Sequence, residues 1–182
     1  MRAIPTRLAG LLHLAPDVHG DDRGFFVETF RSDALASLGV SDEFVQGNHS
    51  RSRRGTLRGL HFAIGRGQGK LVRAARGCIV DVVVDIRRSS PTFGHHEAFE
   101  LDDVAHHQLW VPVGFAHGFL VSSDVADVCY RVTAYYDPAL ERGIAWDDPQ
   151  LGIAWPERDP LLSERDRALP TLAAVTPDLP EW

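Results

Sequence analysis

Two neighbouring segments of the chain combine residue types suited to proton transfer and to anion binding. They read QGNHS over residues 46–50 and TLRGLHF over residues 56–62. The imidazole of His61 suits acid–base chemistry because the reference pKa of histidine lies near neutrality. The guanidinium of Arg58 suits a diphosphate because its planar fork is always charged. The pair favours a proton-transfer site beside a bound anion, and a solvated strand face with one structural histidine explains the same segments about equally well.

Strict alternation along a strand would send Arg58 and His61 to opposite faces of a sheet. The two side chains can share one face only if the alternation is interrupted between them, and Gly59 lies there. A glycine inside a strand often marks a β-bulge, in which one extra residue is inserted into the pairing. We therefore expect a bulge at Gly59.

A later segment, residues 126–136, has the pattern of a long strand with two tyrosines on one face. If the alternation holds, Tyr130 and Tyr136 point the same way, about 20 Å apart at the usual rise of a strand. A barrel that encloses one small ligand could use Tyr130 for chemistry and Tyr136 at its mouth. The alternative is that both tyrosines simply fill the core.

The segment PVGFAHGF, residues 112–119, is similar to the second cupin motif, in which the histidine is a metal ligand. A metal-binding cupin also carries a His-x-His pair and a later Glu, whereas the corresponding place here offers only His61. A tight site needs three or four converging ligands. The pairs His95–His96 and His106–His107 do not supply them, because adjacent side chains diverge on a strand. We expect no metal site.

Short segments rich in Val, Ile, Phe, Leu and Tyr are separated by turns that contain Gly, Pro, Asp or Ser. Strands are predicted at residues 25–30, 44–49, 56–62, 70–75, 78–86, 96–101, 107–112, 117–122 and 126–136. Many strands at this spacing predict an all-β fold, a cupin-like jelly-roll β-barrel with a few short helices. One helix is expected over 33–38, with Ser32 as its N-cap and Gly39 at its end, and a helical turn near 163–168. Because the chain shows no repeat or linker, residues 1–182 are expected to form a single domain.

Composition narrows the class of protein. A formal net charge of -6 disfavours a nucleic-acid binder that works through a general basic field. Neither a signal-peptide pattern nor an apolar stretch long enough to cross a membrane is found, so we expect a soluble cytoplasmic protein. Cys78 and Cys129 lie in apolar strand segments and are expected to be buried, reduced thiols.

Longer segments extend this pattern over residues 20 to 168, nearly the whole chain. They are DRGFFVETFR from residue 22, QGNHSRS from 46, GTLRGLHF from 55, KLVRAARGCIVDVVVDIRRSSPTFG from 70, VPVGFAHGFLV from 111, YRVTAYYDPALERGIAWDDPQLGIAWP from 130 and LSERD from 162. In this order they resemble the dTDP-4-dehydrorhamnose 3,5-epimerase family of deoxysugar biosynthesis. The resemblance implies a cofactor-free isomerase that epimerises dTDP-4-keto-6-deoxy-D-glucose at carbons 3 and 5.

The resemblance also implies roles for four catalytic residues. His61 matches the general base that removes the proton beside the 4-keto group, and Asp166 matches the carboxylate that orients it. Tyr130 matches the acid on the opposite face of the sugar. Lys70 matches a cation aimed at the keto oxygen, where negative charge develops.

The substrate-binding residues follow from the same resemblance. Arg58 would hold the diphosphate, and Tyr136 would stack on the thymine. The remaining matches are the pocket residues Gln46, Asn48 and His117 and the nucleotide or diphosphate contacts Glu141 and Arg165. Because the family is dimeric with exchanged N-terminal strands, Arg23 and Glu28 would reach the nucleotide from a partner subunit.

Several positions depart from the family pattern. Ala63 stands where the family usually has Gln, Gly47 replaces a usual Asp, and Arg165 replaces a usual Lys. None of these changes removes a proton-transfer group, but they leave open which carbons are epimerised. A single-site epimerase acting at carbon 3 or carbon 5 is therefore an alternative. A nucleotide-sugar-binding cupin module without turnover is another.

Overall fold

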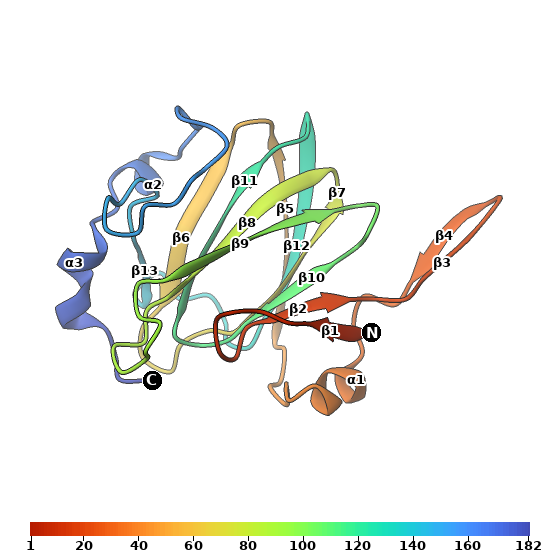
Figure 1. Ribbon diagram of the computed structural model, residues 1–182, viewed down its shortest axis with the longest axis horizontal. Coiled ribbons are helices and arrows are strands. Elements are labelled where there is room, and N and C mark those ends of the chain that lie inside the picture. Colours follow the sequence, from red (N-terminus) through yellow and green to blue (C-terminus); the bar gives the residue numbers. More distant parts are fainter.

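The computed structural model describes residues 1–182, and most strands belong to two antiparallel sheets that pack face to face (Figure 1). The first sheet has six strands in the spatial order β1-β2-β10-β7-β12-β5. Their bounds are β1 Arg2–Ile4, β2 Leu12–Ala15, β10 Gln108–Val111, β7 Lys70–Arg76, β12 Val125–Val132 and β5 Gln46–Arg53.

The second sheet has five strands in the order β13-β6-β11-β8-β9. Their bounds are β13 Glu141–Gly143, β6 Leu57–Ala63, β11 Phe115–Val121, β8 Cys78–Asp85 and β9 His96–Asp102. The chain crosses between the two sheets several times, as in a jelly roll. The predicted all-β, cupin-like jelly-roll architecture is thereby confirmed.

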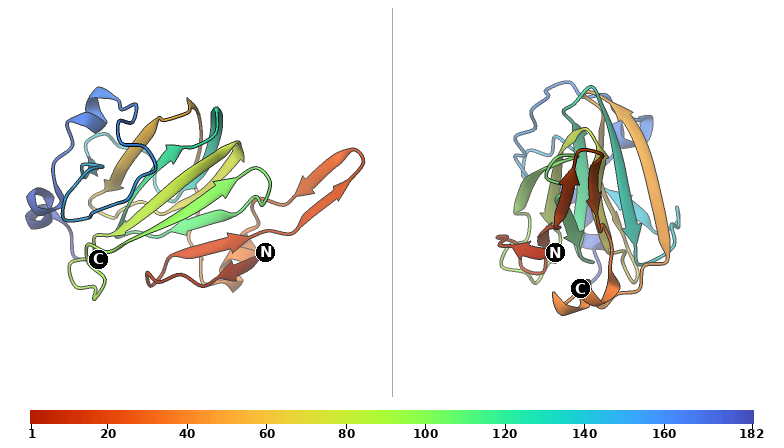
Figure 2. Two further views of the ribbon diagram at one scale, coloured as in Figure 1. Left: turned by 45° about the horizontal axis from the view of Figure 1, so that its top comes forward. Right: turned by 90° about the vertical axis from the view of Figure 1, so that its right-hand side faces the viewer.

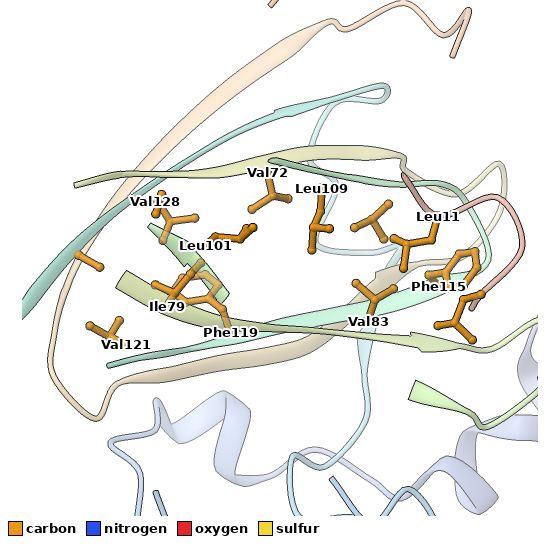
Figure 3. Packing of buried hydrophobic residues seen from close by; sticks show 14 residues of the cluster. Leu11, Val72, Ile79, Val83, Leu101, Leu109, Phe115, Phe119, Val121 and Val128 are labelled. Atoms are coloured by element: carbon orange, nitrogen blue, oxygen red, sulfur yellow. The ribbon is translucent and has the colours of Figure 1, made fainter. Parts of the chain in front are cut away.

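The main core lies between the sheets and is made by the inward residues of both (Figure 3). Val72 and Val128 project from the first sheet, and Val83 and Phe119 project from the second. All four are at most 5% exposed. β-branched and aromatic side chains at every second position of these strands account for this packing.

A second apolar cluster covers the outer face of the five-stranded sheet. Val82 and Val84 of β8 pack there together with Ile144 and Leu172 of the C-terminal segment. This segment carries α2 (Glu164–Arg167), α3 (Leu172–Val175) and the 3-10 turn η1 (Thr176–Asp178). Because both faces of β8 are buried, its sequence is a nearly continuous apolar run rather than an alternating one.

The expected bulge in β6 is confirmed. In the pairing with β11, His117 lies opposite His61, and Phe119 lies opposite Arg58. Two residues separate these positions on β11 but three separate them on β6, so β6 contains one extra residue. This shift brings Arg58 and His61 to the same face. Gly59 has φ +132°, and a Cβ atom there would lie 2.5 Å from the Cα atom of Gly118. Only glycine fits this conformation and this approach of the two strands.

A hairpin of β3 (Val18–Asp21) and β4 (Gly24–Val27) projects away from the sheets (Figure 2). Its side chains are largely exposed, including Phe25 at 60% and Phe26 at 70%. It lies at the opposite end of the molecule from α3 (Figure 1).

Several predicted boundaries were wrong. The strand expected at 126–136 ends at Val132, and the strand expected at 25–30 is only Gly24–Val27. Strands β1, β2, β3 and β13 were not predicted, nor were α3 and η1. Helix α1, Ser32–Ser37, begins one residue earlier than expected, and Ser32 does not cap it. Gly39 follows it with φ +91° as expected, and Ser163 caps α2.

The two cysteines, Cys78 and Cys129, are both free, as predicted, but are partly exposed rather than buried. No helix is long and apolar enough to span a membrane.

A buried carboxylate holds the turn that follows β8. The Asp85 side chain is fully buried and accepts hydrogen bonds from the side chains of Arg87, Ser90 and Thr92. Burial alone would raise the pKa of Asp85, but these hydrogen bonds outweigh it and lower the pKa to about 2. The ionised carboxylate therefore stabilises the folded chain.

We predict that Asp85→Asn lowers the free energy of unfolding by about 2 kcal/mol at pH 7, the value that corresponds to the depressed pKa. Because the folded-state pKa is lowered, this contribution is present above pH 4 and is lost as the pH falls toward about 2. Urea unfolding across this range measures it. A difference between the two proteins that did not shrink with falling pH would contradict this account.

Candidate active site

A cavity of about 350 Å³ opens between the two sheets. Strands β5, β7 and β12 of the first sheet and β6 and β11 of the second contribute to its walls. Of the thirteen site residues predicted from the sequence, eleven line this cavity. They are Gln46, Asn48, Arg58, His61, Lys70, His117, Tyr130, Tyr136, Glu141, Arg165 and Asp166.

The other two predicted residues lie elsewhere. Arg23 is at the turn of the projecting hairpin and pairs with Asp21, and Glu28 follows β4. Neither lines the cavity of its own chain. This placement agrees with the expectation that they would act on a partner subunit, which stays a prediction.

A carboxylate–imidazole pair lies on one wall of the cavity. Nε2 of His61 is 2.6 Å from Oδ1 of Asp166, and the hydroxyl of Ser163 donates to the other carboxylate oxygen at 2.8 Å. Burial would raise the pKa of Asp166, but the hydrogen bonds from His61 and Ser163 outweigh it and lower the pKa. The carboxylate is thus ionised, and Nδ1 is the ring nitrogen of His61 that remains free.

Lys70 supplies a buried cation beside this pair. Its side chain is almost completely buried, and Nζ donates to the backbone oxygen of His61 at 3.3 Å. Burial lowers the pKa of Lys70 to about 8, although the carboxylates of Glu141 and Asp81 act in the opposite direction. An ammonium with a pKa near neutrality can hold or release a proton within the working range of an enzyme.

Tyr130 is half-buried on β12, next to Asn48 of β5 and Val72 of β7. Burial raises the pKa of its phenol, as does the nearby carboxylate of Glu141, while Arg58 opposes the shift. Tyr130 is therefore protonated at neutral pH and able to donate a proton into the cavity.

Polar side chains at the rest of the cavity hold one another in place. Arg165 donates to Glu141 at 2.7 Å, and the side-chain amide of Gln46 donates to Asn48 at 2.8 Å. The backbone N–H of Tyr136 donates to Oε1 of Gln46 at 2.9 Å. Strand β12 ends at Val132, so Tyr136 lies beyond the strand, and its side chain lines the same cavity as Tyr130.

Sequence reasoning missed three residues that line the cavity: Ser50, Gln68 and Phe119. Two of them had a usable signal, because Ser50 continues the alternation of Gln46 and Asn48, and Phe119 lies two residues from His117. Gln68 had none, since it belongs to an irregular loop, where its side chain donates to the backbone oxygen of Ala134.

The chain is similar to known proteins over most of its length. Residues 5–174 match the family described as dTDP-4-dehydrorhamnose 3,5-epimerase. The chain is 49% identical over 169 residues to the dTDP-4-dehydrorhamnose 3,5-epimerase of Pseudomonas aeruginosa, covering 92% of this chain and 93% of that protein. It is 41% identical over 169 residues to a dTDP-4-dehydrorhamnose 3-epimerase of Streptomyces niveus, covering 92% and 82% of the two chains.

The fold is also shared with a solved relative. The dTDP-6-deoxy-D-glucose-3,5-epimerase of Legionella pneumophila, whose crystal structure holds dTDP-4-keto-L-rhamnose, superimposes with a TM-score of 0.96 at 43% identity. The match covers 100% of this chain and 98% of that one. The chain belongs to the dTDP-4-dehydrorhamnose 3,5-epimerase family.

Proposed function

We propose that this protein epimerises dTDP-4-keto-6-deoxy-D-glucose at carbons 3 and 5. The observation that carries the proposal is one cavity lined by the His61–Asp166 pair, the ammonium of Lys70 and the protonated phenol of Tyr130. Inverting a carbon beside a ketone needs a base, an acid and a group that stabilises an enolate. These residues supply the three functions.

The first step removes a proton from the carbon next to the 4-keto group. His61 accepts this proton on its free nitrogen, and Asp166 stabilises the imidazolium that forms. The electron pair of the broken C–H bond moves toward the keto oxygen and creates an enolate. Lys70 stabilises the negative charge on that oxygen, and its burial strengthens the interaction because little water screens it.

The second step returns a proton to the opposite face of the same carbon. Tyr130 donates it, the enolate collapses to the ketone, and the carbon is inverted. The cycle then repeats at the other carbon that flanks the ketone. No atom changes its oxidation state, so acid–base groups are sufficient.

The nucleotide end of the substrate would lie toward Arg58, Arg165 and Tyr136. Arg58 and Arg165 match a diphosphate because guanidinium groups make bidentate contacts with phosphate oxygens. The exposed ring of Tyr136 offers a surface on which thymine can stack.

The projecting hairpin supports a homodimer in which N-terminal strands are exchanged. Phe25 contacts the ring of His106, but it and Phe26 both stay more than half exposed, and contiguous exposed apolar surface is typical of interfaces. The first sheet carries a groove of about 310 Å³, lined in part by His49 and Arg73. The side-chain amide nitrogen of Gln108, at the same groove, is buried without a hydrogen-bond partner. A partner hairpin could fill this groove.

The proton-transfer roles are tested by incubation with dTDP-4-keto-6-deoxy-D-glucose in heavy water. We expect His61→Ala to abolish deuterium incorporation at the carbons flanking the ketone. We expect Tyr130→Phe to retain exchange but to lower inversion roughly 10²–10⁴-fold, since the proton can return only from the first face. His95→Ala is the control, because this imidazole is exposed and does not line the cavity.

Full exchange in the His61 variant would remove His61 as the base. In the unaltered protein, deuterium incorporation at only one carbon would show that the enzyme is a single-site epimerase. Binding of the dTDP-sugar without exchange at any pH would select the non-catalytic module.

The role of Lys70 predicts a pH dependence. Because the ammonium is the stabilising form and its pKa is about 8, kcat/KM should fall as the pH rises through that value. Lys70→Met should lower kcat/KM roughly 10²–10³-fold and abolish this limb of the profile. The phenol of Tyr130 does not interfere, since its pKa is raised above 10. If kcat/KM of the Lys70 variant still fell in the same way as the pH rises, the fall would belong to another group.

The exchanged hairpin is tested by sedimentation. We expect Phe26→Asp to convert a dimer to a monomer, because the exposed ring would otherwise be buried against the second copy. Arg23→Ala should keep the dimer but raise KM several-fold. The control is Leu161→Asp, an exposed apolar residue of the C-terminal segment. A Phe26 variant that sediments as the unaltered protein does would contradict the proposal.

A further inference from the structure

Two strands of the second sheet carry a polar side chain in a row of otherwise apolar inward residues. On β8, Asp81 lies between Ile79 and Val83, which both belong to the core between the sheets. On β11, His117 lies between Phe115 and Phe119, which belong to the same core. By alternation, Asp81 and His117 therefore face the core as well.

The two polar residues pair with each other. Both oxygens of Asp81 lie close to Nε2 of His117, at 2.9 and 2.8 Å. Asp81 is fully buried, and no other group donates a hydrogen bond to its carboxylate. The side chain of His117 is only 9% exposed and lines the cavity directly opposite His61 in the strand pairing.

Burying this carboxylate is unfavourable for folding. A buried ion loses several kcal/mol of hydration, which one hydrogen-bonded partner offsets only in part. A valine or isoleucine at position 81 would continue the apolar row of β8 without that loss. The carboxylate is better explained by its effect on His117 than by stability.

That effect is to define which nitrogen faces the cavity. With Nε2–H donated to Asp81, Nδ1 is left to contact a ligand. Histidines that bind metals are held by carboxylates in the same way, and their tautomer is set by that hydrogen bond. His61 has a similar arrangement with Asp166, so two neighbouring imidazoles are each anchored by a carboxylate.

We propose that Asp81 is a positioning residue that fixes the Nε2–H tautomer and the ring orientation of His117, so that Nδ1 accepts a hydrogen bond from a hydroxyl of the bound sugar. The inference rests on the proposed function for its substrate, but the Asp81–His117 geometry does not depend on it.

Nitrogen-15 NMR of the histidine side chains, together with kcat/KM, tests the proposal. In the unaltered protein, Nε2 of His117 should keep its proton across the pH range. Asp81→Val should lose this single tautomer and lower kcat/KM roughly 10- to 100-fold, the usual effect of removing a residue that orients a functional side chain. Asp81→Asn retains an oxygen that can accept the same hydrogen bond, so it should keep the tautomer and more activity than the valine variant.

Asp85→Asn is the matched control, because it removes the other fully buried carboxylate of β8, whose partners lie outside the cavity. It should lower stability without changing the His117 signals or kcat/KM. A neutral His117 that carries its proton on Nδ1 in the unaltered protein would overturn the inference. A valine variant with unchanged tautomer and kcat/KM would do the same, as would a folded asparagine variant no better than valine. If the unaltered protein shows no turnover, the proposed function fails, and the NMR signals still decide the role of Asp81.

Discussion

The hydrogen bond between His61 and Asp166 joins a strand of the barrel to a segment 105 residues further along the chain. It can form only if the C-terminal segment packs against the outer face of the second sheet. Asp148 helps to hold this segment, because its carboxylate accepts the backbone N–H groups of Leu151 and Leu172. The apolar cluster around Ile144 and Leu172 also packs the segment against the sheet. The imidazole proposed as the base is therefore oriented by the part of the chain that completes the fold.

The interior of the barrel serves two requirements that oppose each other. The main core is apolar and stabilises the fold, while the adjoining cavity holds Lys70, His117 and Tyr130 in surroundings with little water. Burial lowers the pKa of Lys70 to about 8, within the working range of an enzyme, and it raises the pKa of Tyr130, so that the phenol stays protonated. Hydrogen bonds within the chain satisfy two of these groups, since His117 pairs with Asp81 and Lys70 donates to the backbone oxygen of His61.

Local physical rules predicted the strands well where side chains alternate or form apolar runs, as in β7 and β8. They failed at β2, whose four residues are too few to establish a period, and at the end of β12, where the chain turns without a glycine or proline signal. The predicted cap at Ser32 was wrong because Ser32 is already the first helical residue, and Arg31, which precedes it, makes no side-chain cap. The bulge at Gly59 could be predicted, because a chemical expectation for Arg58 and His61 conflicted with the alternation.

Some site residues could likewise be predicted from local sequence, and others could not. The chemistry of His61 and Arg58 could be inferred from their own segment, whereas periodicity gives no information about a contact as distant as that of Asp166. That residue entered only through the resemblance to a family. Asp81 was overlooked, although an acid within the apolar run CIVDVVVD is a signal that depends on residue type alone. A buried acid in a strand is uncommon enough to justify a search for its partner.

Gly59 and Gly118 do not line the cavity, yet their backbones meet at a distance that excludes any larger residue from either position. A Cβ atom on Gly118 would lie 2.8 Å from the backbone oxygen of Arg58, on the strand that carries His61. A substitution of a residue that lines the cavity alters the contacts of that side chain and leaves the two strands in place. A side chain at either glycine would instead separate the two strands and move Arg58 and His61 together. The strictest limit on the evolution of new specificities in this scaffold is thus expected at two positions that contribute no functional group.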